Sequence, residues 1–119
     1  MNKLMTGFWE SLDRLVGSSR VVIDRPKGTA HPQYGDMIYP VDYGYMEGTG
    51  AIDGGGVDIW IGTQGIGKVQ GMLCTTDMVK RDVEIKVLCG CTIEEVDQIM
   101  AVMNQHQMSV MLVKRWEEP

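Results

Sequence analysis

The chain has 119 residues, of which 44% are hydrophobic and 23% charged, and its formal net charge is -5 at pH 7. A chain of this length buries one core but not two, so we expect a single domain over residues 1–119. The acidic excess argues against nucleic acid as a partner, because phosphate backbones are bound by clustered Lys and Arg. Three cysteines are too few for a disulfide framework and no basic leader precedes an apolar run, which predicts a reduced, cytoplasmic protein.

The first predicted element is an amphipathic helix at about residues 4–16. Apolar side chains recur there at helical spacing, polar ones lie opposite, and Gly17 ends the pattern. The helix is expected to pack on the rest of the domain or on a neighbouring subunit, which leaves a homo-oligomer open. Its polar face is not basic, so we expect no membrane partner.

The segment that follows reads as a strand at about residues 20–24 with a loop after it. Arg25-Pro26-Lys27-Gly28 leads into this loop, and His31 lies farther along it. Arg25, Lys27 and His31 together form a basic cluster. They are candidates for binding a phosphate, and the alternative is that they are solvated loop charges.

Two acidic pairs with the same five-residue spacing lie in the middle of the chain. Asp53 and Asp58 enclose three consecutive glycines, and Asp77 and Asp82 enclose a second short segment. Carboxylates brought close together raise each other's pKa and oppose folding unless cations neutralise them. Because Mg²⁺ prefers such oxygen ligands, the sequence predicts that the four aspartates form a Mg²⁺ site.

The strands around these aspartates are predicted from alternation. Residues 57–61 read as a strand whose apolar side chains share one face, while Asp58 and Trp60 share the other. Residues 68–75 and 83–88 are expected to form a hairpin that delivers Asp77 and Asp82. The run from Tyr39 to Tyr45 is interpreted as a rigid Pro/Gly/aromatic turn, and the alternation of its tyrosines around Pro40 and Gly44 also fits an extended segment.

The C-terminal third is predicted to contain a helix and a last strand. Thr92 and Glu95 have the spacing of a capping box, and apolar residues at helical spacing follow, which predicts a helix at about residues 93–105. A last strand is expected at about residues 108–114.

At these positions the sequence resembles the family I soluble inorganic pyrophosphatases. The matching motifs occur in the family's order over roughly residues 20–88, and they are Val21-Val22-Ile23-Asp24-Arg25-Pro26, Tyr39 to Tyr45, Asp53 to Asp58, and Thr76-Asp77 with Asp82. The resemblance implies an α+β, mainly β fold, in which a small barrel of the oligonucleotide/oligosaccharide-binding type at about residues 20–88 carries the two helices. It also implies Mg²⁺-dependent, two-metal hydrolysis of pyrophosphate or a related small-molecule phosphoanhydride.

The resemblance also implies roles for individual residues. Asp53, Asp58, Asp77 and Asp82 would bind metal; Asp24, Tyr43 and Asp58 would be catalytic; and Arg25, Lys27 and Tyr43 would contact the substrate.

Several family positions carry other residues here. Gly55 stands where the family has a water-activating Asp, and Glu84 and Gln33 stand where substrate lysines are expected; Gly35 and Met78 also replace acidic residues. A second hypothesis is therefore a binding module of the same fold that holds Mg²⁺ and a phosphate ligand without hydrolysing it. If the enzyme is intact, Asp24 or Asp42 is a candidate for the lost water-activating role. A single-strand nucleic-acid binder, the third alternative, would need basic grooves with exposed aromatic side chains.

Overall fold

The structure is a computed structural model that describes residues 3–51 and 53–116. Its elements in chain order are α1 (Lys3–Ser18), β1 (Val21–Arg25), β2 (Asp42–Met46), β3 (Val57–Ile61), β4 (Val69–Asp77), β5 (Asp82–Cys89), α2 (Ile93–Met103) and β6 (Met108–Lys114). The six strands form one mixed sheet in the order β1-β2-β3-β5-β4-β6, in which β3 and β5 run parallel. The predicted α+β class is confirmed, and so are both helices, the hairpin and the last strand.

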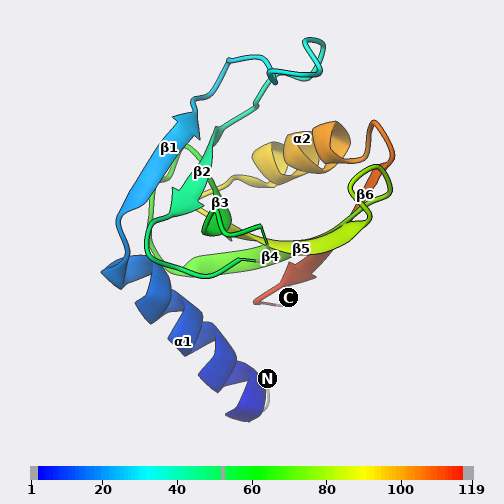
Figure 1. Ribbon diagram of the computed structural model, residues 1–119. Helices are drawn as coiled ribbons and strands as arrows, with labels where there is room; N and C mark the ends of the chain where they lie inside the picture. Colours follow the sequence, from blue (N-terminus) through cyan, green and yellow to red (C-terminus); the bar gives the residue numbers. More distant parts are fainter. Residues whose placement is uncertain (1–2, 52, 117–119) are drawn as a thin grey trace.

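The sheet has a separate hydrophobic core on each face, because successive side chains of a strand point to opposite sides. The core under α1 consists of Trp9, Val16, Met46, Ile59, Val69, Val87 and Cys89. The core under α2 consists of Tyr39, Val41, Trp60, Leu73, Leu88, Cys91, Ile99 and Met103. Figure 1 shows the two helices on opposite sides of the sheet. The predicted division of the third strand is confirmed, since Ile59 packs under α1 while Trp60 packs under α2.

The prediction of a barrel is wrong, because the sheet is open. Closing a barrel requires the two edge strands to pair with each other. Here β6 pairs with the outer edge of β4, and β1 pairs with β2 alone among the described strands. The last strand therefore occupies the edge of β4, and the sheet curves without closing (Figure 1).

For residues 39–45 the extended interpretation is confirmed from Asp42 onward, because Asp42–Met46 forms β2 between β1 and β3, and the turn does not continue there. Gly44 explains how this segment fits into the sheet. A Cβ at this position would overlap the carbonyl oxygen of Val22, so only glycine lets β1 approach β2 this closely.

The predicted capping box at the start of α2 is confirmed. The Thr92 hydroxyl accepts a hydrogen bond from the Glu95 amide at 3.1 Å, and Glu95 Oε1 accepts one from the Thr92 amide at 2.9 Å. The same carboxylate oxygen accepts from the amide and hydroxyl of Thr63, both at 3.2 Å. Burial alone would raise the pKa of Glu95, but these hydrogen bonds outweigh it and lower the pKa.

The helix α1 covers only part of its face of the sheet. Trp9 and Val16 are buried, whereas Phe8 and Leu15 on the same apolar stripe are exposed. Asp13 fixes the helix by accepting hydrogen bonds from the Val69 amide and the Arg115 guanidinium. Neither helix in residues 3–51 and 53–116 combines the length and hydropathy needed to cross a membrane.

Candidate functional site

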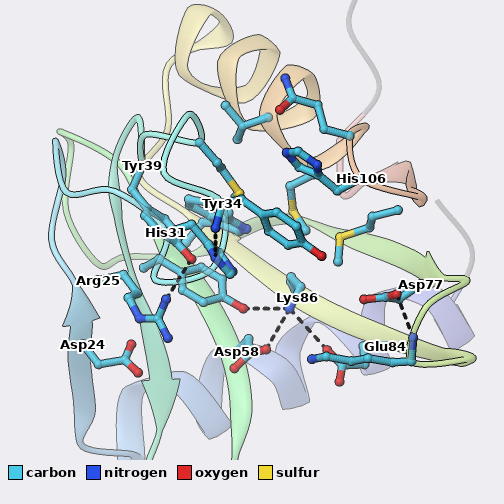
Figure 2. Close-up of a pocket in the computed structure, with 18 of the residues that line it drawn as sticks. Asp24, Arg25, His31, Tyr34, Tyr39, Asp58, Asp77, Glu84, Lys86 and His106 are labelled. Atoms are coloured by element: carbon cyan, nitrogen blue, oxygen red, sulfur yellow. Dashed lines mark hydrogen bonds and ion pairs between the residues drawn. The ribbon is translucent and has the colours of Figure 1, made fainter.

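A cavity of about 260 Å³ lies on the α2 side of the sheet, where several parts of the chain meet. Its lining comes from β1, the segment between β1 and β2, β2, β3, the β4–β5 hairpin and the corner between α2 and β6. Acidic, basic and aromatic side chains all contribute to it, and Figure 2 shows ten of them labelled. The cavity therefore contains residues of the first matching motif, such as Asp24, and of the last, such as Asp77.

The centre of this site is Lys86, whose side chain is only 7% exposed. Its Nζ donates to the Tyr43 hydroxyl at 2.7 Å and to Asp58 Oδ2 at 2.8 Å, and it lies 3.3 Å from Glu84 Oε2 (Figure 2). The sheet register explains this arrangement. Asp58 and Lys86 are directly opposite on parallel β3 and β5, and Glu84 precedes Lys86 on the same face of β5.

The charge state of this cluster follows from its partners. Burial alone would lower the pKa of Lys86, but Tyr43 and Asp58 outweigh it and raise the pKa above its ordinary value. Burial raises the pKa of Tyr43 even though the Lys86 cation opposes this, so the phenol is neutral. Lys86 is therefore a fixed internal cation that neutralises part of an acidic cavity.

A β-bulge in β1 brings two adjacent charged residues to the cavity. The register with β2 shifts between Ile23 and Arg25, so Asp24 is the extra residue. Successive strand residues ordinarily point to opposite faces, and a bulge re-aims them. Asp24 and Arg25 both line the cavity as a result, and the Arg25 guanidinium donates to the Tyr39 hydroxyl at 3.3 Å.

The loop residue His31 also lines the cavity, and it is held in one tautomer. Its Nδ1 accepts from the amides of Gln33 at 3.0 Å and Tyr34 at 3.3 Å, which leaves the proton on Nε2. Burial lowers the pKa of His31, and the positive charge of Arg25 lowers it further. His31 is therefore a neutral N–H donor near neutral pH.

Of the four predicted metal ligands, Asp53, Asp58 and Asp77 line the cavity, whereas its described lining does not include Asp82. Asp77 Oδ1 accepts from the amides of Val79 at 2.9 Å and Lys80 at 3.0 Å, so it stabilises the hairpin turn. The hairpin delivers Asp77 and Asp82 opposite each other, as predicted.

The glycine run forms a second hollow beside the first. Asp24, Asp53 and Asp58 line both spaces, and the three consecutive glycines line the second one. Asp53 Oδ1 accepts from the Gly55 amide at 2.9 Å, which turns the loop back on itself. The three carboxylates therefore stand between the glycine loop and the main cavity.

Whether these carboxylates can bind a metal ion depends on how many protein ligands the ion needs. Within residues 3–51 and 53–116, no three His, Cys, Asp or Glu side chains are grouped closely enough to hold a metal by themselves. A site that needs a full set of protein ligands does not match this arrangement. Mg²⁺, however, is commonly bound by one or two carboxylates, several waters and the phosphates of its substrate. The aspartates around the glycine loop fit that mode of binding.

Two other sequence candidates lie away from the cavity. Lys27 is exposed, and its amide donates to Asp42 Oδ1 at 2.9 Å. The described cavity lining includes neither residue. The structure therefore brings together the two expected β1 residues but not the basic loop residue that follows them.

Lys86 is the main functional residue that sequence reasoning missed. A lysine inside a predicted strand, two residues after Glu84 and between apolar neighbours, was the available signal. Its partner Asp58 is 28 residues away, on a strand that pairs with β5 only through a crossover. The alternation of side chains along β5 indicates that Glu84 and Lys86 share one face. Only the parallel pairing of β3 with β5 places Lys86 beside Asp58.

No protein-family model matches this sequence, and no significant match was found among curated proteins. The resemblance to the pyrophosphatases therefore rests on the ordered motifs.

Proposed function

We propose that this protein hydrolyses a phosphoanhydride, pyrophosphate or a related diphosphate, in a Mg²⁺-dependent reaction. The observation that supports the proposal is that residues from separate motifs meet in one cavity. Asp24 and Arg25 from β1, Tyr43 from β2, Asp58 from β3 and Asp77 from β4 line one cavity, although their motifs extend over more than fifty residues. A structural role alone does not require charged residues from three strands and a tyrosine from a fourth to meet.

The charge balance of the cavity explains why a cation belongs to the reaction. Five carboxylates line it, on Asp24, Asp53, Asp58, Asp77 and Glu84, against three permanent cations, on Arg25, Lys80 and Lys86. A diphosphate anion entering alone would be repelled by this excess. Its Mg²⁺ complex would be attracted, with one or both of Asp53 and Asp58 as protein ligands beside water and phosphate oxygens.

Bound Mg²⁺ would supply charge neutralisation and a more acidic water. The chain's own residues would orient the reaction. Arg25 would contact a phosphate oxygen, Lys86 would hold the Asp58 carboxylate in position, and Asp24 would accept a proton from the attacking water. The water oxygen bonds to one phosphorus as the bridging P–O bond breaks, and both protons of the water end on the two phosphate products.

A second function, binding without hydrolysis, is favoured by one observation. Asp58 already has a counter-ion at 2.8 Å in Lys86, and Gly55 provides no water-activating carboxylate. A site neutralised in this way would hold a Mg²⁺–diphosphate complex and release it unchanged.

Phosphate release from pyrophosphate, with Mg²⁺ or with chelator, tests the proposal. We expect release only with Mg²⁺, and a loss of about 10²-fold or more in Asp24→Asn if Asp24 takes the proton. The control is Asp97→Asn, an exposed position on α2 that is not part of the cavity lining. No release from any phosphoanhydride, combined with Mg²⁺-dependent binding of pyrophosphate, would establish the binding function instead.

A further inference from the structure

The two sides of the cavity differ in chemistry. Figure 2 shows Asp24, Asp58, Lys86, Glu84 and Asp77 along one side, while His31, Tyr34 and His106 lie toward the opposite side. Apolar side chains of Met37, Val102, Met103 and Met108 also line the cavity, and Met108 is the strand partner of Asp77. A ligand that fills the whole cavity would therefore be charged at one end and aromatic at the other.

The rings on the second side are stacked on one another. Tyr34 and His106 are stacked with centroids 4.0 Å apart and planes 9° from parallel. His31 follows, 5.1 Å from Tyr34 and 6.2 Å from Tyr39, nearly parallel to the latter ring. His106 belongs to the α2–β6 corner, so these rings come from segments about seventy residues apart and meet only at the cavity.

A bare pyrophosphate ion would leave this ring surface unused. It consists of charged oxygens around two phosphorus atoms, which in the proposed function contact Mg²⁺ and Arg25 and make no use of aromatic rings. Aromatic side chains, in contrast, bind planar rings by stacking, and every nucleobase has a face that can stack. The aromatic rings of the cavity therefore favour a diphosphate that is attached to a planar ring.

We infer that the substrate is a nucleoside diphosphate, whose diphosphate binds the charged side of the cavity and whose base extends the stack that Tyr34, His31 and His106 form. This inference rests on the proposed function and names the substrate class for the same site. In the reaction, a water oxygen bonds to the β-phosphorus and the bridging P–O bond to the α-phosphate breaks. The products are a nucleoside monophosphate and inorganic phosphate, and the surplus proton of the water is released to solvent.

The test compares substrates that share the diphosphate but differ in the ring. Phosphate release is measured with adenosine diphosphate, uridine diphosphate, methyl diphosphate, a short-chain alkyl diphosphate and pyrophosphate, all with Mg²⁺. We expect both nucleotides to have a kcat/KM at least tenfold above methyl diphosphate, the size that stacking of one base supplies. An equal or higher kcat/KM for the alkyl diphosphate would overturn the assignment of a planar group.

Variants of Tyr34 separate stacking from a structural role of the ring. In Tyr34→Ala the ratio of kcat/KM for adenosine diphosphate to that for pyrophosphate should fall tenfold or more, and Tyr34→Phe should restore it. If Tyr34 only fastens its loop to the α2–β6 corner, both substrates lose activity together and the ratio stays constant, which rejects the inference.

The outcomes also distinguish this inference from the proposed function. Hydrolysis of pyrophosphate without any preference for nucleotides leaves the proposed function standing and refutes the substrate class. If nothing is hydrolysed, the proposed function fails, and calorimetric binding with Mg²⁺ then decides the inference. Tighter binding of adenosine diphosphate than of pyrophosphate supports it, and the reverse order refutes it.

Discussion

Replacing Lys86 by Met should destabilise the protein, because it removes an internal cation while keeping the length of the side chain. The Nζ atom makes the contacts with Tyr43, Asp58 and Glu84, at 2.7, 2.8 and 3.3 Å. Removing one partner of a buried ion pair typically costs about 3–5 kcal/mol. The Asp58 and Glu84 side chains are 24% and 15% exposed, so water stabilises them in part. We therefore expect a loss of about 2–3 kcal/mol, equivalent to a drop in Tm of roughly 10 °C.

Thermal and urea unfolding in chelator measure this loss. Lys80→Met is the control, since Lys80 lines the same cavity from the exposed hairpin turn and should change stability by less than about 0.5 kcal/mol. A double-mutant cycle with Asp58→Asn should give a coupling energy of about 1.5 kcal/mol or more. A Lys86→Met protein within about 0.5 kcal/mol of the natural one, or a coupling near zero, would refute the role of Lys86 as counter-ion.

The same variant tests whether Asp58 can bind metal. Removing Lys86 frees the Asp58 carboxylate, so Mg²⁺ at a hundred times its Kd for Lys86→Met should stabilise this variant by about 2.7 kcal/mol. The same Mg²⁺ concentration should stabilise the natural protein less. Equal Mg²⁺-dependent shifts in Tm for the two proteins would show that Asp58 is not a metal ligand.

Three further changes have expected outcomes. Gly55→Asp should be tolerated, because the backbone there is outside the left-handed region and a Cβ would lie 3.4 Å from the Asp53 carboxylate oxygen. If the site lacks a general base, this variant should raise kcat for phosphate release about 10²-fold. A lower kcat would show that another carboxylate already acts as the base. Gly44→Ala should abolish the cooperative thermal transition by separating β1 from β2, whereas Gly67→Ala, where a Cβ would meet open space, should not. Glu95→Gln should cost about 1 kcal/mol at neutral pH. Because the folded pKa of Glu95 is lowered, its contribution exists above the ordinary value of 4.5 and disappears as the pH falls below it, so urea unfolding should show the difference vanishing in acid.

The elements that the sequence predicts well are those with strong local signals. The strand at residues 57–61 matches β3, and the capping box at Thr92 places the start of α2 correctly. The hairpin was also predictable, because its strands are adjacent in sequence and alternate clearly. In the segment 39–45, Pro40 and Gly44 have the composition of a turn, whereas the alternation of the tyrosines correctly indicates an extended segment. In the fold Gly44 serves instead for the close approach of β1, which is a tertiary requirement that composition does not reveal.

The open sheet has a similar explanation. The last strand was predicted at the correct residues, but its partner was not, and pairing of β6 with β4 determines whether the sheet can close. In the candidate site, Asp53, Asp58 and Asp77 were found because their spacing is regular. Asp82 has the same spacing, yet it is not part of the described cavity lining. Spacing predicts that two residues can meet, whereas the direction of each side chain depends on the twist and bulges of the strands that carry them.

The position of Lys86 bears on one departure from the pyrophosphatase pattern that the sequence resembles. Glu84 occupies the place where the family pattern expects a lysine, which by itself would leave the site with one cation fewer and one anion more. Because side chains on a strand repeat every two residues, a lysine at position 86 points to the same face as position 84. It lies directly opposite Asp58 and within 3.3 Å of Glu84. Lys86 therefore places a positive charge on this face of β5, where it neutralises two carboxylates. Under the proposed function, Lys86 and Mg²⁺ would compete for the Asp58 carboxylate, and the outcome would influence whether the site hydrolyses its ligand or only holds it.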